Sequence, residues 1–166
     1  TREAYLSVVA RLREAVPGIT FSTDLIVGFP GETESDFGET LSLVERAGFD
    51  DAYTFRYSVR EDTPAVRLRD HVPESEAAER LERLIAAVRH QARYRNLTRV
   101  GQTVEVLLER PARRGDLLLG RTRANLLVLV DLPPSALGEY HQVVLTGTTG
   151  STFTGQLVRP QLAVLA

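Results

Sequence analysis

The sequence predicts an α/β segment followed by a small all-β barrel, and two observations support this fold class. Up to about residue 98, stretches with helical spacing alternate with apolar β-forming runs, which is typical of parallel strands covered by helices. Beyond residue 101, short β-forming runs alternate with turns that contain glycine or proline, which indicates a small barrel or sandwich. We therefore expect two domains, over residues 1–98 and 99–166.

Each element of the first domain is predicted by its own pattern. Apolar residues spaced as on one helix face predict a helix over residues 5–16, which Pro17-Gly18 ends. Residues 19–27 end in a continuous apolar run, as buried parallel strands do. The same reasoning gives a helix over 34–47, a strand over 51–57, a loop over 58–73 and a long helix over 74–97.

The second domain is expected to contain only strands. Its β-forming runs occupy residues 103–108, 117–121, 126–130, 141–145 and 152–158. The first domain, in contrast, supplies only two strong strands, whereas a parallel sheet covered by helices normally has more. We therefore expect the chain to be a piece of a longer protein.

Composition excludes several classes of function. The chain has 166 residues, of which 43% are hydrophobic and 25% charged, as in ordinary globular proteins. No apolar run approaches the roughly 18 residues of a membrane helix, so we expect no membrane span and a cytoplasmic location. Because the chain has no cysteine, it offers no disulfide, no thiolate nucleophile and no cysteine-held metal cluster. The lack of methionine again suggests a fragment.

The turn after the first strand is the most specific local feature. The apolar run Leu25–Val27 stops at Gly28, and Thr33 with Asp36 three residues later has the form of a helix N-cap. The turn glycines permit a close approach to a ligand, and the start of a helix favours an anion. The spacing alone favours an ordinary strand-to-helix connection, because it is neither a GxGxxG nor a Walker pattern.

Other polar residues leave two interpretations open. Arg60, after the second strand, either binds an anionic ligand or is solvated beside its acidic neighbours. The three histidines are scattered, and we expect none to bind a metal. The second domain has a net charge of +2 against −4 for the first. Its basic residues form either a patch for nucleic acid phosphates or a solvated face: Arg110, Arg113, Arg114, Arg121 and Arg123.

Three ordered motifs resemble one family. The stretch Thr23–Thr33 resembles the late barrel segment of the radical S-adenosylmethionine methylthiotransferases, and Phe55–Arg60 with Thr63–Ala65 resembles their next strand and loop. Val100-Gly101, Gly120–Thr122 and Asn125 resemble their C-terminal TRAM domain, a small RNA-binding β-barrel. The stretch Gly120–Asn125 is more similar to the tRNA-modifying (MiaB) type than to the type that acts on a ribosomal protein.

The resemblance implies a function. Enzymes of the tRNA-modifying type insert a methylthio group at carbon 2 of a modified adenosine beside the anticodon. They use S-adenosylmethionine and two 4Fe-4S clusters, each held by three cysteines, and consist of an N-terminal cluster domain, a radical barrel and TRAM. The chain would then be the C-terminal part of the radical barrel plus TRAM, with tRNA as partner and with the N-terminal cluster domain missing. Without cysteines, this piece alone is expected to be inactive.

The resemblance also implies site residues. Residues of the cofactor wall, the turn after it and the mouth of the site would be Ile26, Val27, Gly28, Pro30, Gly31, Glu32, Tyr57, Ser58 and Arg60. The RNA-binding residues would be Arg121, Thr122 and Asn125, together with the basic residues above. The family usually has proline at Val59 and glycine at Asp62, so we expect the loop here to be less tightly turned.

Two further hypotheses remain from this stage. One is a fragment of a methylthiotransferase that acts on an aspartate of a ribosomal protein. The other is a stand-alone RNA-binding module, in which the second domain holds RNA whatever the first domain does.

Overall fold

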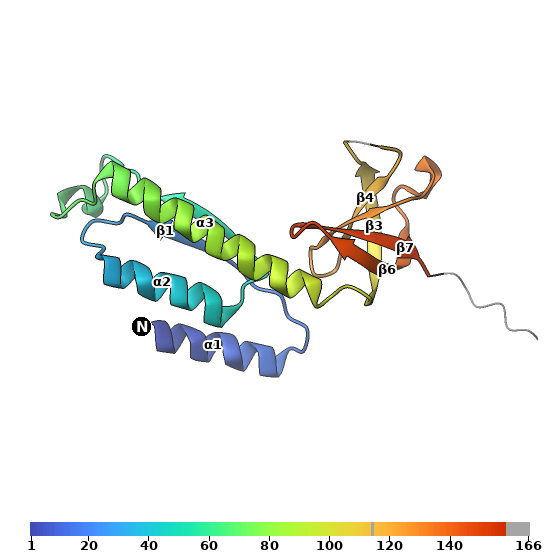
Figure 1. Cartoon of the computed structure of the whole chain (residues 1–166), viewed down its shortest axis with the longest axis horizontal. Coiled ribbons are helices and arrows are strands. Elements are labelled where there is room, and N and C mark those ends of the chain that lie inside the picture. Colours follow the sequence, from blue (N-terminus) through green and yellow to red (C-terminus); the bar gives the residue numbers. More distant parts are fainter. Residues whose placement is uncertain (114, 159–166) are drawn as a thin grey trace, which may run out of the picture. The chain divides into compact units, whose positions relative to one another are not determined.

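A computed structural model of the protein describes residues 1–113 and 115–158 (Figure 1). The chain divides into two compact units, Thr1–Ala92 and Arg93–Ala166. Arg114, one of the arginines predicted to bind RNA, lies outside the described residues. None of the described helices is long and apolar enough to cross a membrane.

The first unit contains helices and two strands in the predicted order. Its helices α2 and α3 have the predicted bounds, and its two strands are slightly shorter than predicted. The elements are α1 (Arg2–Ala15), β1 (Ser22–Val27), α2 (Glu34–Ala47), β2 (Asp51–Arg56), the short 3-10 helix η1 (Pro64–Arg67) and α3 (Glu74–Leu97), whose last turns belong to the second unit.

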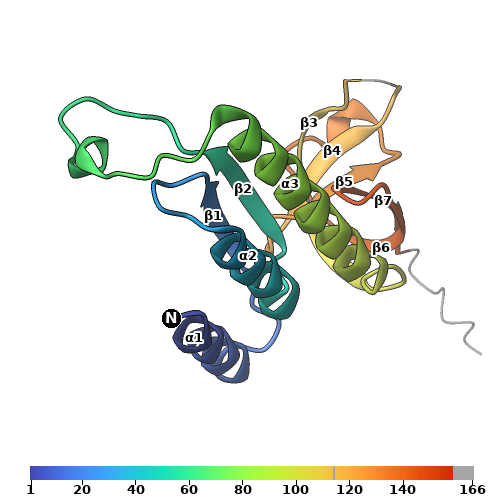
Figure 2. The same cartoon turned by 60° about the vertical axis from the view of Figure 1, so that its left-hand side comes forward.

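Strands β1 and β2 form a parallel two-stranded sheet, with Ile26 paired to Phe55. Helices α2 and α3 lie on one face of this sheet (Figure 2). The core between them is formed by Leu25, Val27, Phe37, Val44 and Leu84. The opposite face carries exposed apolar side chains, Ile26, Tyr53 and Phe55, of which Ile26 is 54% exposed. The sheet is therefore covered on one face only, within the part of the chain that the structure describes.

Helix α1 differs from its sequence pattern. Its apolar stripe predicts one buried face, but Val9 is buried while Tyr5, Val8, Leu12 and Val16 are exposed. The physical reason is that α1 packs beside α2, and not on the β1–β2 sheet, so most of its stripe has no apolar surface to cover it.

The second unit contains a closed five-stranded barrel in the order β3-β4-β5-β7-β6. Val106, Leu108, Val128, Val143 and Phe153 are fully buried in its core. β3 and β6 run further than predicted because each contains a register shift, after Leu108 and after Leu145, that lets pairing continue. The strands are β3 (Thr103–Pro111), β4 (Leu118–Thr122), β5 (Leu127–Val130), β6 (Tyr140–Thr148) and β7 (Thr152–Leu157), with a 3-10 turn η2 (Pro134–Ala136).

Candidate functional site

The turn after β1 depends on the glycine at position 28. Gly28 has a φ of +75°, in the left-handed region that favours glycine. A Cβ added to Gly28 would lie 2.7 Å from the Cβ of Ala77 on α3. The glycine therefore allows helix α3 to pack closely against the turn. The structure gives Gly28 this packing role, and its contact with a cofactor stays a prediction.

The backbone donors of the turn already have partners inside the protein. Gly28 N–H donates to the Glu32 carboxylate (2.6 Å), Gly31 N–H to the Asp70 carbonyl (2.8 Å), Glu32 N–H to the Phe29 carbonyl (2.9 Å) and Thr33 N–H to the Asp36 carboxylate (2.9 Å). Each of these N–H groups therefore donates to an internal acceptor, and the binding of an anionic ligand at the start of α2 stays a prediction.

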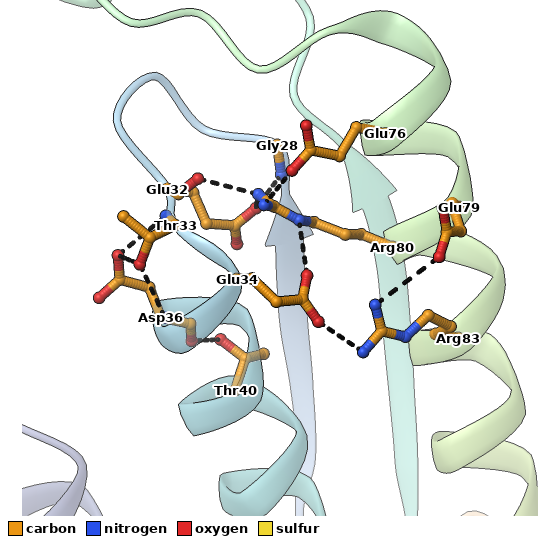
Figure 3. Close-up of polar contacts among 10 residues, drawn as sticks. All are labelled: Gly28, Glu32, Thr33, Glu34, Asp36, Thr40, Glu76, Glu79, Arg80 and Arg83. Carbon is orange, nitrogen blue, oxygen red and sulfur yellow. Dashed lines mark hydrogen bonds and ion pairs between the residues drawn. The ribbon is translucent and has the colours of Figure 1, made fainter.

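A buried arginine fixes the turn to helix α3 (Figure 3). Arg80 is 2% exposed. Its Nη1 donates to the Glu32 carboxylate at 2.8 Å and to the Glu32 carbonyl at 2.9 Å. Its Nη2 donates to Glu76, and its Nε lies 3.6 Å from a carboxylate oxygen of Glu34. The guanidinium thus joins the end of the turn to the first turns of α3.

Glu32 is committed to this internal network. Its carboxylate accepts from both Gly28 N–H and Arg80, and its side chain is 10% exposed. The sequence motif suggested Glu32 but not Arg80. The helical spacing could have indicated Arg80, because position 80 lies between the buried Ala77 and Leu84 on one face of α3. A charged side chain on a buried helix face requires a buried partner.

The start of α2 carries a complete capping box. The Thr33 side chain accepts from Asp36 N–H, and the Asp36 carboxylate accepts from Thr33 N–H, as the sequence predicts. The Thr33 hydroxyl, which also donates to Asp36, holds the pKa of that carboxyl below its ordinary value. The hydrogen bond from Arg83 likewise lowers the pKa of Glu34 and raises that of Arg83.

Tyr57 brings the end of β2 to the same turn. Its N–H donates to the Val27 carbonyl at 2.8 Å, and its ring lies edge-on to Phe29 with centroids 5.2 Å apart. Its hydroxyl is buried without a hydrogen-bond partner among the described residues. Ser58 and Arg60, in contrast, are exposed beyond the strand end.

The predicted wall residues do not share one face. Val27 is fully buried under the helices, whereas Ile26 lies on the bare face beside its cross-strand partner Phe55. Because successive strand residues point to opposite faces, Ile26 and Val27 cannot both contact one ligand through their side chains. The contact of Ile26 with the cofactor stays a prediction, as does that of Val27, whose side chain is buried in the core under the helices.

The loop after β2 is tightly turned without the family's glycine. Asp62 has a φ of +68°, and the Thr63 N–H donates to the Arg60 carbonyl at 3.4 Å, as does the Thr63 hydroxyl at 2.8 Å. The turn forms without glycine because aspartate tolerates the left-handed conformation better than most residues, and the expectation of a looser turn than the family's stays a prediction.

The cofactors implied by the resemblance fit this chain unequally. An adenosine has an apolar surface to lie on, the bare sheet face around Ile26 and Phe55. The clusters do not fit, because the chain has no cysteine. Over residues 1–113 and 115–158, no group of three or more His, Asp or Glu side chains is arranged to hold a metal ion.

In the barrel, the signature Gly120–Asn125 closes the turn between β4 and β5. A Cβ at Gly120 would lie 2.5 Å from the Leu107 carbonyl, so only glycine fits. Thr122 is buried and its hydroxyl accepts from Leu126 N–H at 3.1 Å. Asn125 has a φ of +60°, and its side-chain oxygen accepts from Arg121 at 2.6 Å. Thr122 therefore shapes the turn, and Asn125 orients Arg121.

The predicted basic residues that the structure describes lie on β3, on β4 and in the loops that flank β4. Arg113 lies in the loop before β4, and Arg123 lies in the turn after it. The strand between them is about 17 Å long. Arg121 Nε donates to Glu109 at 3.1 Å, and Arg123 Nε donates to Glu105 at 2.8 Å. Arg110 is exposed near the end of β3. Direct contact of these residues with RNA stays a prediction.

Comparisons with known proteins found one matching domain family and several similar proteins. Residues 97–158 match the TRAM domain family. Over 95% of its length the chain is 46% identical to a tRNA-2-methylthio-N(6)-dimethylallyladenosine synthase of Shouchella clausii, and covers 31% of that protein. It is 43% identical to the synthase of Clostridium novyi over 95% of the chain and 35% of that protein. It is 44% identical to the synthase of Anoxybacillus flavithermus over 99% of the chain and 31% of that protein.

The closed barrel and the matched residues define a TRAM-domain protein. The similarity extends through the α/β unit as well, so the chain is similar to the MiaB-type tRNA methylthiotransferases along nearly its whole length, as the motifs indicated. It spans about a third of the length of the curated relatives that it matches.

Proposed function

We propose that this chain is the C-terminal third of a tRNA methylthiotransferase, an enzyme that makes 2-methylthioadenosine from a modified adenosine beside the anticodon. The observation that supports this most directly is the similarity to tRNA-2-methylthio-N(6)-dimethylallyladenosine synthases over 95% of the chain. The three relatives compared are tRNA enzymes, which favours a tRNA substrate over a ribosomal protein. A tRNA substrate would place the protein in the cytoplasm.

We assign residues 1–98 to the last part of a radical S-adenosylmethionine (β/α) barrel. The support is a parallel β1–β2 pair with helices on one face and exposed apolar side chains on the other. In a closed barrel the uncovered face is the interior. On this proposal Ile26 and Phe55 would line the site, and Tyr57, Ser58 and Arg60 would lie at the carboxyl ends of the strands.

S-adenosylmethionine, when bound, would supply the radical and the methyl group. The chain's own contribution would be to hold the adenosine on the Ile26 side chain and on the backbone around Gly28. Pro30, Gly31 and Glu32 would act indirectly, because the Glu32–Arg80 pair keeps the turn in place. With no cysteine to hold a cluster, this chain by itself is expected to lack methylthiotransferase activity.

We assign residues 99–166 to the RNA-binding TRAM barrel, with tRNA as partner. The support is the family match over residues 97–158 and the arginines along β3 and β4. The test is binding of labelled tRNA to the 166-residue chain at several salt concentrations. We expect binding that weakens as salt rises, because phosphate contacts release counterions.

A double variant makes this test specific. Replacing Arg110 and Arg113 with glutamine should weaken tRNA binding and flatten its salt dependence, whereas Arg11→Gln and Arg89→Gln, on exposed positions of α1 and α3, should change neither. If the parent chain fails to bind tRNA at low salt, the RNA-binding assignment is wrong.

A further inference from the structure

An exposed tyrosine lies in line with a fixed arginine on the outside of the barrel. Leu107 of β3 pairs with Tyr140 of β6 on one side and with Arg121 of β4 on the other. Directly paired residues point to the same face of a sheet, so the Tyr140 and Arg121 side chains share one face. Their strands are two spacings apart, which is about 10 Å.

Tyr140 is available as a flat apolar surface. It is 63% exposed, although aromatic rings are usually at least half covered in a folded domain. The other aromatic residue on strands β3–β7 within the described part of the chain, Phe153, is buried in the core. Any stacking on this strand face therefore depends on Tyr140.

Arg121 is held in one orientation. Its Nε donates to Glu109 and its Nη1 donates to Asn125, while its Nη2 takes part in neither contact. A guanidinium fixed in this way loses little conformational freedom when it binds an anion. The side chain is partly exposed, so its Nη2 can reach a phosphate from solvent.

Two carboxylates on this side of the barrel are paired with arginines, and a third lies beside a histidine. Glu109 pairs with Arg121, Glu105 with Arg123, and Glu139 lies 3.1 Å from a ring nitrogen of His141. The arginines on this face therefore already have carboxylate partners, and a phosphate is not drawn to a strongly cationic surface. Most of the binding free energy on this face must come from an uncharged contact.

We propose that the outer face of β6, β3 and β4 binds a single-stranded RNA nucleotide, with the base stacked on Tyr140 and the adjoining phosphate contacted by Arg121. This inference rests on the proposed function, because it specifies how the barrel holds RNA. Stacking on tyrosine accepts any base, so the site recognises an unpaired nucleotide and not a sequence. A duplex, whose bases are already stacked, does not fit.

The experiment uses the 166-residue chain and a labelled short RNA of anticodon-loop sequence, either single-stranded or annealed to its complement. Tyr140→Ala should weaken single-strand binding about 5- to 150-fold at every salt concentration and leave the salt slope unchanged. Tyr140→Phe should bind like the parent. Arg121→Ala should reduce the slope by about 0.7, the value for one phosphate on a single strand.

Tyr94→Ala is the matched control, because Tyr94 on α3 is 65% exposed. It should leave the affinity unchanged. The inference is overturned if Tyr140→Ala binds as tightly as Tyr94→Ala, as it would if Tyr140 contacted a protein partner. It is also overturned if the duplex binds as well as the single strand. A parent chain that binds neither RNA would instead contradict the proposed RNA-binding function.

Discussion

Single residues determine how the turn after β1 is held. The Gly28–Glu32 turn has no metal or disulfide to fix it, and its position depends on the buried Arg80 guanidinium and the Glu32 carboxylate. Buried charges are costly unless they are paired, and here Arg80 has carboxylates on three sides. The contribution of Arg80 is therefore to the geometry of the turn.

Removing one partner of this buried pair should be strongly destabilising. We expect Arg80→Ala to lower the free energy of unfolding by about 3 kcal/mol, because it leaves the Glu32 carboxylate buried and unpaired. Urea unfolding followed by circular dichroism measures this change. Arg83→Ala, at a partly exposed pair with Glu34, should lower the free energy of unfolding much less, because solvent screens this pair.

A double variant separates the charge effect from lost packing. Arg80→Met combined with Glu32→Gln should be more stable than Arg80→Met alone, because the packing at position 80 is the same and no unpaired buried charge remains. Equal losses in the single and double variants would mean that packing, and not the buried charge, explains the effect.

The loop after β2 offers a stabilising change. Asp62→Gly should raise the free energy of unfolding by up to about 1 kcal/mol, because glycine adopts a positive φ without steric cost. The midpoint of thermal unfolding would report the gain. Glu61→Gly, one residue earlier and without a positive φ, should lower the midpoint instead. A lower midpoint for Asp62→Gly would show that the aspartate side chain itself supports the loop.

At the scale of elements, helix α2 depends on its acidic first turn. The pKa values of Glu34 and Asp36 are lowered in the folded protein, by hydrogen bonds from Arg83 and Thr33 respectively. These hydrogen bonds stabilise the folded protein fully at pH values above the ordinary pKa values of the two carboxyls, 4.5 for Glu34 and 3.8 for Asp36. The stabilisation is lost as the pH falls through their lower pKa values in the folded protein.

Thermal unfolding of the chain should therefore shift to lower temperature below about pH 4.5. Replacing Glu34 with glutamine and Asp36 with asparagine should lower the midpoint at neutral pH and make it less dependent on pH in the acid range. A double variant with the same pH profile as the parent would show that other carboxylates control acid unfolding.

Two glycine-to-alanine changes should have opposite effects on the free energy of unfolding, because the space around the two glycines differs. Gly120→Ala should cost about 1–3 kcal/mol, because its Cβ would meet the backbone of β3. Gly38→Ala, in α2 with open space around it, should gain about 1 kcal/mol from helix propensity. Calorimetry of the two variants tests both signs, and a stabilised Gly120→Ala would contradict the packing explanation.

The sequence predicted elements better than it predicted contacts. Capping residues and the 3.6-residue period determined the bounds of α2 and α3, because these are local signals. The register shifts in β3 and β6 were missed, since they depend on neighbouring strands. Arg80 and the internal acceptors of the turn were missed for the same reason: Glu32 and Arg80 are distant in sequence and meet only in the fold.

At the scale of the whole molecule, each of the two units has one surface with a separate proposed role. The α/β unit leaves one sheet face bare, with Ile26, Tyr53 and Phe55 exposed. The barrel presents a row formed by Tyr140, Leu107 and Arg121. On the proposed function, the first surface holds the cofactor and the second holds the RNA. The sequence motifs indicated both regions, but strand alternation in the structure decided which side chains face outward.

The most direct test of the account is a chimera. The matching third of the Shouchella clausii synthase is replaced by this chain, and tRNA from cells that lack their own enzyme is analysed by mass spectrometry for the methylthio product. We expect product from the chimera, and none when it carries Ile26→Arg, which places a charge on the bare sheet face. Glu82→Arg, on an exposed position of α3, should leave the product level unchanged. A folded chimera that carries its clusters and binds tRNA but makes no product would contradict the account, as would full activity of the Ile26→Arg chimera.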